Sequence, residues 1–284
     1  MPELPEVETV RRGLEPSLVG ARLTGVDLRR PDLRFPLPER FAARLRGARV
    51  EALERRAKYL LAKLDTGETW VTHLGMTGRF TVEGKGQPGR FHNQEGGQDK
   101  HTHLVLETDG GAVIGFNDAR RFGYMDLIPT GVLGESRWFR GLGPEPLGPD
   151  FTPAVLAKAF RGKTQNVKVS LLDQRIVAGL GNIYVVEALH RAKIAPERAA
   201  GALTTAELKR LHAAIVLVLG EAIEAGGSTL KDFRHADGDL GYFQHSFRVY
   251  DRKGEPCSDP KCKGAIVRTV QSGRSSFHCP ACQR

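Results

Sequence analysis

Alternation of apolar and polar residues dominates the first half of the chain, after an opening segment with helical character. Residues 3–18 begin with Pro and Glu and end near Pro16, which predicts a helix. Short alternating segments bounded by Gly, Pro, Asp or Asn then predict antiparallel strands at 22–30, 49–55, 59–64, 70–74, 103–107 and 112–117. The fold class predicted is therefore α+β, with an antiparallel β-sandwich domain and flanking helices at 1–128. The Gly- and Gln-rich stretch 83–100 predicts a mobile loop.

The pattern becomes helical after a Pro- and Gly-rich stretch at 129–150, which we interpret as an interdomain linker. Thr152-Pro153 predicts the start of a helix that ends at Arg161. Thr204 and Glu207 form a capping-box pattern, and 151–227 is predicted to be a helical domain. Its long helix carries an apolar stripe that serves core packing, formed by Leu208, Leu211, Ile215, Leu219 and Ile223.

Charge adds information about the partner. The formal net charge is +9, and most of the basic residues are Arg, which suits bidentate contacts to phosphate. A basic chain favours a polyanionic partner, nucleic acid first, although Arg richness can also reflect genomic base composition. No apolar run has the length of a membrane span, and the acidic N-terminal segment does not resemble a signal peptide. We therefore expect a cytoplasmic protein without a membrane partner.

All four cysteines lie near the C-terminus, as Cys257-x4-Cys262 and Cys279-x2-Cys282. Two close thiol pairs can complete a tetrahedral shell around one structural Zn²⁺, and the alternative is four free cysteines. The segment 250–284 is thus a predicted zinc finger, with strands at 266–270 and 275–278 and a tip at 271–274. Arg274 at this tip suits phosphate contact, but it could equally be a solvated turn residue.

The N-terminal sequence Met1-Pro2-Glu3-Leu4-Pro5-Glu6 carries candidate chemistry. Removal of Met1 would make Pro2 a free secondary amine, which can attack a carbonyl-type carbon and form an iminium without losing a further proton. Glu3 beside it could move protons at the same carbon. The alternative is that Pro2 and Pro5 only rigidify the start of a helix.

Three turns offer further candidates. Gly179-Leu180-Gly181-Asn182 precedes a helix and, with Lys163 and Lys168 upstream, suits a phosphate clamp, although it could be a tight helix connection. Met76 follows one apolar strand, and Arg120 and Phe122 follow another. Such groups could fill the gap left by an extruded nucleotide, whereas in isolation Met76 and Phe122 would be core residues and Lys58 a surface charge.

Together, these segments resemble the bacterial formamidopyrimidine-DNA glycosylase family over nearly the whole chain. The resemblance rests on 2–13, 55–61, 73–78, 117–123, 172–187, 227–233 and 241–257. It implies an N-terminal β-sandwich domain, a C-terminal helix–two-turn–helix domain with a zinc finger, and damaged double-stranded DNA bound between them. It also implies a lesion-recognition loop within 228–249, a monomer, and a place at the nucleoid.

Residue roles also follow from the resemblance. Pro2 matches the nucleophile, Glu3 its acid/base partner, and Lys58 a proton donor or phosphate contact. Met76, Arg120 and Phe122 match a trio inserted into the duplex, with Arg120 facing the orphaned cytosine. Glu6 matches a carboxylate near the lesion pocket. The family contacts DNA at the positions of His73, His101, Lys163 and Lys168. Asn182 and Arg274 match a pair that pinches the phosphates around the lesion, and Arg274 also matches a residue that assists the second elimination.

The reaction implied is excision of oxidised purines, 8-oxoguanine and formamidopyrimidines, followed by β,δ-elimination at the abasic site. Leu4 and the full inserted trio favour this purine branch over the related endonuclease VIII branch, and a lesion-binding protein without activity is the rival from another class. Three features depart from the family pattern: the x4 spacing of the first cysteine pair, Val169 in place of a proline, and a longer loop at 83–100.

Overall fold

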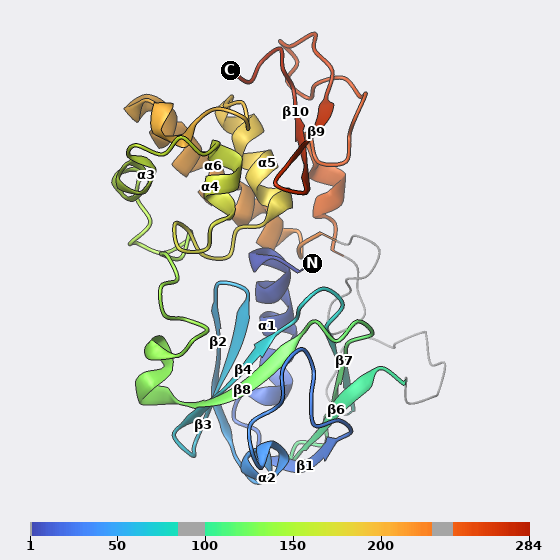
Figure 1. The fold of residues 1–284 in the computed structure, drawn as a ribbon. Helices are drawn as coiled ribbons and strands as arrows, with labels where there is room; N and C mark the ends of the chain where they lie inside the picture. Colours follow the sequence, from blue (N-terminus) through green and yellow to red (C-terminus); the bar gives the residue numbers. More distant parts are fainter. Residues whose placement is uncertain (1, 85–99, 229–240) are drawn as a thin grey trace. The chain divides into compact units, whose positions relative to one another are not determined.

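Two units make up the fold in the computed structural model, which describes residues 2–84, 100–228 and 241–284 (Figure 1). The N-terminal unit contains 1–140 together with 225–242, and the C-terminal unit contains 141–224 and 243–284. The chain therefore returns to the first unit after the helices of the second. The finer boundaries expected from the sequence, at 1–128, 129–150, 151–227, 228–249 and 250–284, stay predictions.

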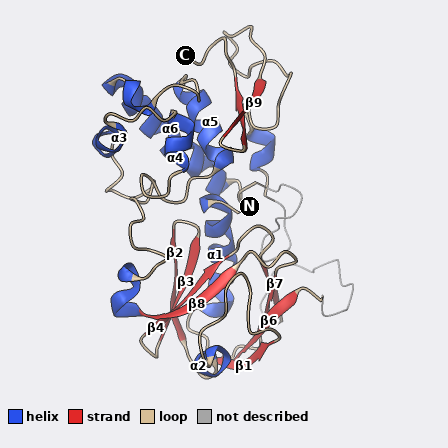
Figure 2. Ribbon diagram, viewed as in Figure 1, coloured by secondary structure: helices blue, strands red, loops and turns tan. Residues whose placement is uncertain are grey.

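The N-terminal unit is built on two four-stranded antiparallel sheets (Figure 2). The first has the order β1 (Leu23–Leu28), β6 (Thr102–Thr108), β7 (Val113–Asn117), β5 (Arg79–Glu83). The second has the order β2 (Val50–Arg56), β3 (Tyr59–Leu64), β4 (Glu68–His73), β8 (Tyr124–Pro129). Apolar side chains of both sheets share one buried core, so the predicted sandwich is confirmed.

Helices flank this core. Helix α1 (Leu4–Leu18) buries Val7, Val10 and Leu14 in it, which confirms the predicted N-terminal helix. The short helix α2 (Phe41–Leu45) adds Phe41 and Leu45. It was not predicted from the sequence, because five residues are too few for a helical period to be recognised.

The predicted strands all form, but the sequence reasoning missed β5 and β8. β8 ends at Pro129, where the Pro- and Gly-rich stretch begins, and a 3₁₀ helix, η1 (Thr130–Glu135), follows it. Both missed strands gain their stability from tertiary pairing, β5 with β7 and β8 with β4. Most of the predicted loop at 83–100, and most of the lesion-recognition loop expected within 228–249, lie outside the described residues.

The C-terminal unit is helical. Its elements are α3 (Pro153–Phe160), α4 (Val167–Leu172), α5 (Asn182–Ala192), η2 (Ala200–Ala202), α6 (Thr205–Glu224) and η3 (Phe243–Ser246). Thr152 caps α3 through its hydroxyl, which accepts from the amide of Val155 at 3.3 Å. Among these elements, α4 and the two 3₁₀ helices η2 and η3 were not predicted. No helix within the described part of the chain is long and apolar enough to cross a membrane.

Helix α6 shows both features that its sequence predicts. The amide of Glu207 donates to Thr204 Oγ1 at 3.3 Å, and the amide of Thr204 donates to Glu207 Oε2 at 2.8 Å, so the capping box forms. Arg198 also pairs with Glu207, and this contact lowers the pKa of Glu207 to about 2. The apolar stripe is buried along its whole length, at Leu208, Leu211, Ile215, Leu219 and Ile223.

A β-hairpin ends the chain. Strands β9 (Val267–Gln271) and β10 (Arg274–His278) pair in the predicted antiparallel register. The turn consists of Ser272 and Gly273 alone, with φ of 47° and 74°, the left-handed conformations that two-residue hairpin turns require. The tip is thus shorter than predicted, and Arg274 begins a strand instead of occupying the turn.

Candidate functional site

The start of α1 is organised by the buried carboxylate of Glu6. Its Oε2 accepts from the amide of Glu3 at 2.8 Å. Its Oε1 accepts from the amide and the hydroxyl of Ser228, at 2.9 and 3.0 Å. These bonds provide donors for both carboxylate oxygens, although the residue is only 2% exposed. Glu6 therefore connects Glu3, which follows Pro2, to Ser228, the last described residue before 229–240.

Lys58 lies at the same end of the N-terminal unit as Pro2 and Glu3. Glu8 of α1 pairs with Arg55 at 3.1 Å, and Arg11, one turn later, donates to the carbonyl of Leu53 at 3.2 Å. Helix α1 thus runs antiparallel to β2, so its first residues point towards the β2–β3 turn. Lys58 is the second residue of that turn and is only 7% exposed. It is not the surface charge that the sequence alone suggests.

His73 lies beside this turn, because Tyr59 and His73 are paired in the register of β3 and β4. Burial, followed by the positive charges of Lys58 and Arg34, lowers the pKa of His73 to about 3. The ring is therefore neutral at physiological pH. Nδ1 accepts from the amide of Gly75 at 3.0 Å, which leaves the proton on Nε2 as a donor.

Aromatic side chains pack around the ring of His73. The ring of His73 stacks on Tyr124 with centroids 4.9 Å apart, and the hydroxyls of Tyr59 and Tyr124 lie 2.7 Å apart. Trp138 stacks on the same tyrosine at 4.3 Å. These contacts restrict the imidazole to one orientation.

The predicted trio lies on two turns of the N-terminal unit, one after β4 and one after β7. Phe122 is 42% exposed and is therefore not a core residue, while Met76 is half-buried. The guanidinium of Arg120, also exposed, lies 4.7 Å from the centre of the Phe122 ring. His101 is adjacent, since its carbonyl accepts from the amide of Asp118 at 3.0 Å. The structure thus brings Arg120, Phe122 and His101 into one region.

Three predicted DNA contacts of the C-terminal unit converge on the first residues of β10. The Nζ of Lys168 donates to the carbonyls of Arg274 and Ser275 at 3.4 and 3.2 Å. Nδ2 of Asn182, the first residue of α5, donates to the same carbonyl of Ser275 at 3.0 Å. Residues about a hundred positions apart in sequence are thereby held at one point, with the side chain of Arg274 exposed.

Lys168 is an unusual member of this group, because it is fully buried on α4. Burial, with a smaller contribution from the charge of Arg274, lowers the pKa of Lys168 to about 8. Its hydrogen bonds run to protein carbonyls, so it positions the backbone of Arg274 as well as contributing charge.

Lys163 and Arg274 line an open hollow of about 660 Å³ in this unit. Arg175 lies in its wall and is paired with Asp173 at 2.7 Å. Cations and polar groups around an open surface hollow suit an anionic group such as phosphate.

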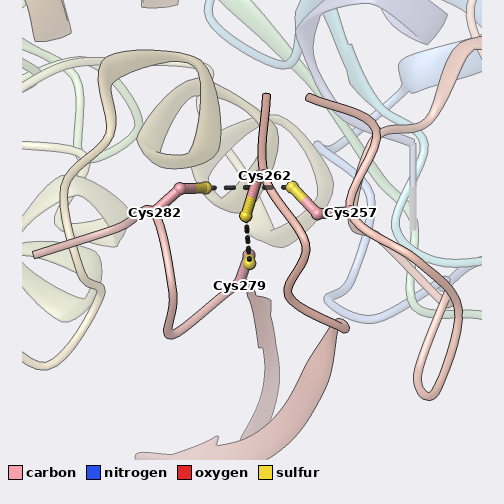
Figure 3. A group of neighbouring side chains, drawn as sticks. All are labelled: Cys257, Cys262, Cys279 and Cys282. Atoms are coloured by element: carbon pink, nitrogen blue, oxygen red, sulfur yellow. Dashed lines mark hydrogen bonds between the residues drawn. The ribbon is translucent and has the colours of Figure 1, made fainter. Parts of the chain in front are cut away.

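The four cysteines form a closed cluster (Figure 3). All four sulfur atoms lie within 4.8 Å of one another, with Cys257 and Cys282 3.8 Å apart and Cys262 and Cys279 3.6 Å apart. A regular tetrahedron with Zn–S bonds of about 2.3 Å has S–S edges of about 3.8 Å. The residues therefore fit one zinc ion, and the x4 spacing of the first pair does not prevent this. Four cysteine ligands leave no open position, so the zinc is structural.

One organising residue escaped the sequence reasoning. Glu187 of α5 is fully buried, and its carboxylate accepts from the amides of Arg248, Val249 and Tyr250 at 2.9–3.0 Å. This contact ties α5 to the segment that leads into the zinc finger. No local signal identifies it, since a glutamate in a helix usually faces solvent.

Comparison with known proteins agrees with this arrangement. The family model described as "Formamidopyrimidine-DNA glycosylase N-terminal domain" matches residues 1–125, and the one described as "Formamidopyrimidine-DNA glycosylase H2TH domain" matches residues 142–234. A formamidopyrimidine-DNA glycosylase of Caulobacter vibrioides is 60% identical over 286 residues and covers 100% of both chains. One of Jannaschia sp. is 59% identical, again over 100% of both.

Solved structures give the same result. The crystal structure of the MutM (Fpg) protein of Thermus thermophilus is similar with a TM-score of 0.85 and 40% identity, covering 99% of this chain and 98% of that one. The Lactococcus lactis Fpg in complex with DNA containing an abasic site has a TM-score of 0.86 and 34% identity over 100% of both chains. The chain therefore belongs to the formamidopyrimidine-DNA glycosylase family.

Proposed function

We propose that this protein excises oxidised purines from duplex DNA with the N-terminal amine of Pro2 as nucleophile, and then cleaves the strand by β,δ-elimination. The family activity is that of a base-excision-repair DNA glycosylase with abasic-site lyase activity. One observation carries the assignment of the nucleophile: α1 is antiparallel to β2, so Pro2 and Glu3 lie at the end of the unit where the buried Lys58 is found. An amine, a carboxylate and an ammonium group are the set that Schiff-base chemistry needs.

The chemistry follows from these groups. The nitrogen of Pro2 attacks C1′ of the flipped nucleotide and gives up its proton, while the bond from C1′ to the base breaks and the base leaves with a proton. The bond from C1′ to O4′ then opens, O4′ takes a proton, and C1′ and the nitrogen of Pro2 form an iminium. This iminium acidifies the C2′ proton, whose transfer to a base expels the 3′ phosphate. Loss of a second proton then expels the 5′ phosphate, leaving a one-nucleotide gap. Glu3 is the proposed proton carrier, and Lys58 the proposed proton donor or phosphate contact.

The other residues prepare the DNA. Extruding a nucleotide costs a few kcal/mol, and insertion of Met76, Arg120 and Phe122 would offset this cost. Neutral His73 offers Nε2–H to a phosphate oxygen, and His101 lies beside the Arg120 turn. Lys163, Asn182 and Arg274 bind phosphate in the C-terminal unit, and the buried Lys168 positions the backbone of Arg274 and adds positive charge. Glu6 acts by holding the Pro2–Glu3 segment and Ser228, next to the loop expected to recognise the lesion.

Zinc has no step in this reaction. When bound by Cys257, Cys262, Cys279 and Cys282, it stabilises the fold of the finger that carries Arg274. A monomer that works at the nucleoid in the cytoplasm is the state that we propose, because the substrate is chromosomal DNA.

Borohydride trapping tests the central claim. Protein mixed with a duplex that contains 8-oxoguanine opposite cytosine is treated with borohydride, and the adduct is mapped by mass spectrometry. We expect a covalent adduct on the nitrogen of Pro2 in molecules from which Met1 has been removed. The matched variant Pro2→Gly should bind the damaged duplex nearly normally and lose most strand cleavage.

Two results would contradict the proposal: normal strand cleavage by Pro2→Gly, or an adduct on another residue. A Lactococcus lactis Fpg has also been crystallised with DNA containing an oxidised pyrimidine. A duplex with an oxidised pyrimidine therefore belongs in the same assay, and exclusive trapping on it would favour the endonuclease VIII type of specificity. Tight binding without any adduct, in protein with a free Pro2 amine, would favour a lesion-binding protein without activity.

A further inference from the structure

We propose that Asp118 and Thr77 form a positioning pair that locks the two turns carrying Met76, Arg120 and Phe122 into one rigid unit. The inference deepens the proposed function and rests on it, because it explains how the inserted side chains keep their relative positions. Neither residue is expected to touch the reacting atoms.

Asp118 is the centre of the arrangement. It is fully buried, and its Oδ2 accepts from the amide of Gly123 at 2.7 Å. Its Oδ1 accepts from the hydroxyl of Thr77, which belongs to the other turn. The backbone of Asp118 is fixed as well, since its amide donates to the carbonyl of His101 and its carbonyl lies 2.9 Å from Nε2 of His103.

Thr77 completes the connection in the opposite direction. Its hydroxyl oxygen accepts from the amide of Arg120 at 3.1 Å while its proton is given to Asp118. A hydroxyl has one proton and two lone pairs, so both bonds can form at once. One threonine side chain therefore connects the turn of Met76 to both ends of the Asp118–Arg120 segment.

Close backbone packing makes the two turns a single body. A Cβ atom on Gly75 would lie 2.3 Å from the amide nitrogen of Gly123 and 2.3 Å from the carbonyl carbon of Phe122. A Cβ atom on Gly123 would lie 2.9 Å from the carbonyl oxygen of His73. Such distances leave no room for one turn to slide past the other, and only glycine permits them at both positions.

The two carboxyl oxygens of Asp118 match their surroundings. Both of its oxygens face donors, the amide of Gly123 and the hydroxyl of Thr77. An asparagine of the same shape would turn its NH₂ group either towards the amide of Gly123, which would lose its acceptor, or towards the hydroxyl of Thr77, whose proton would then lose its acceptor. Valine at position 77 would remove both bonds of the hydroxyl, whereas serine would retain them.

Loosening of the two turns should lower the activity on duplex DNA selectively. Side chains that enter a base stack must be held in place beforehand, because ordering them during binding lowers the fraction of productive complexes. A single-stranded abasic site needs no insertion and tests only the chemistry. The ratio of the two activities therefore separates positioning from catalysis.

The experiment compares T77V, T77S and D118N with wild type in single-turnover assays. Thr81→Val is the matched control, because Thr81 is exposed on β5 and its hydroxyl makes only a long contact, 3.5 Å, to the carbonyl of Gly115. The substrates are a duplex with 8-oxoguanine opposite cytosine and a single strand with an abasic site. 2-Aminopurine next to the orphaned base reports insertion by its fluorescence, and thermal unfolding shows that each variant is folded.

We expect T77V and D118N to excise the base from the duplex roughly tenfold more slowly and to give a smaller fluorescence change. Their cleavage of the single strand should stay within about twofold of wild type, since only the inserted groups are misplaced and the reacting groups keep their geometry. T77S and T81V should resemble wild type on both substrates.

A wild-type rate for T77V on the duplex would overturn the positioning pair while leaving the proposed function intact. Equal losses on both substrates would also overturn it, because they would indicate a general defect. Wild-type protein that cleaves neither substrate would refute the proposed function, and the positioning role with it.

Discussion

The two groups of candidate site residues, one in each unit, are held by hydrogen bonds of opposite polarity, although elsewhere in the C-terminal unit the buried carboxylate of Glu187 also accepts from backbone amides. In the N-terminal unit, buried carboxylates collect backbone amides: Glu6 accepts from Glu3 and Ser228, and Asp118 accepts from Gly123. In the C-terminal unit, side-chain donors collect backbone carbonyls, with Lys168 and Asn182 both bound to Ser275.

This difference has an electrostatic consequence. Buried carboxyl groups in the N-terminal unit bind backbone amides and so hold the start of α1 and the turn that presents the exposed Arg120. In the C-terminal unit, the carbonyls of β10 partly satisfy a buried ammonium group, and the side chain of Arg274 stays exposed. In the function that we propose, the first group serves chemistry and insertion and the second contacts phosphate.

The largest effect should come from a substitution that disrupts the zinc finger, which carries β10 and Arg274. Cys279→Ala removes one zinc ligand, and since metal binding and folding of such a finger are coupled, β10 should lose its fixed position. We expect zinc to be lost and the affinity for damaged duplex to fall by roughly 100-fold or more. Metal analysis and fluorescence anisotropy measure the two effects.

Ser258→Ala is the control for this variant, because Ser258 is exposed between the first two cysteines. Full zinc content with unchanged affinity in Cys279→Ala would show that the finger does not depend on the cluster.

The buried carboxyl group of Glu6 can be tested by Glu6→Gln, which keeps the shape and replaces one acceptor oxygen with an NH₂ group. The amide NH₂ would face at least one of the donors of Glu3 and Ser228, so we expect the free energy of unfolding to fall by about 2–3 kcal/mol. Urea unfolding measures this loss. Glu54→Gln serves as the control, since Glu54 is an exposed residue paired only with Lys63 in the contacts described. Equal stabilities of the two variants would break the comparison between the units.

The buried cation predicts a smaller effect that depends on pH. The pKa of Lys168 is about 8 in the folded protein against an ordinary value of 10.5, so between these values the unfolded state holds more protons and the free energy of unfolding rises with pH. Relative to Lys168→Met, wild type should gain roughly 1–2 kcal/mol between about pH 7.5 and 9.5. Parallel unfolding curves of the two proteins across this range would contradict a depressed pKa.

Local patterns in the sequence accounted for much of this molecule. Alternation predicted six of the eight strands in the N-terminal unit, the capping box and apolar stripe predicted α6, and cysteine spacing predicted a zinc cluster whose geometry the structure provides. These features depend on residues that are close in sequence or on a simple period, so the residue types alone carry the information. The N-terminal motif likewise identified Pro2 and Glu3 as candidates.

Only the tertiary structure decided how the candidates are grouped. The register of β3 with β4 and the direction of α1 along β2 bring Lys58, His73 and the start of α1 to one end of the unit. Packing of α4 and α5 against β10 places Lys168 and Asn182 on one carbonyl, and the contact from Thr77 to Asp118 crosses forty-one residues. Such pairings arise from strand register and core packing between distant segments, which no local pattern encodes. The sequence therefore determined which groups could act, and the tertiary structure decided which of them act together.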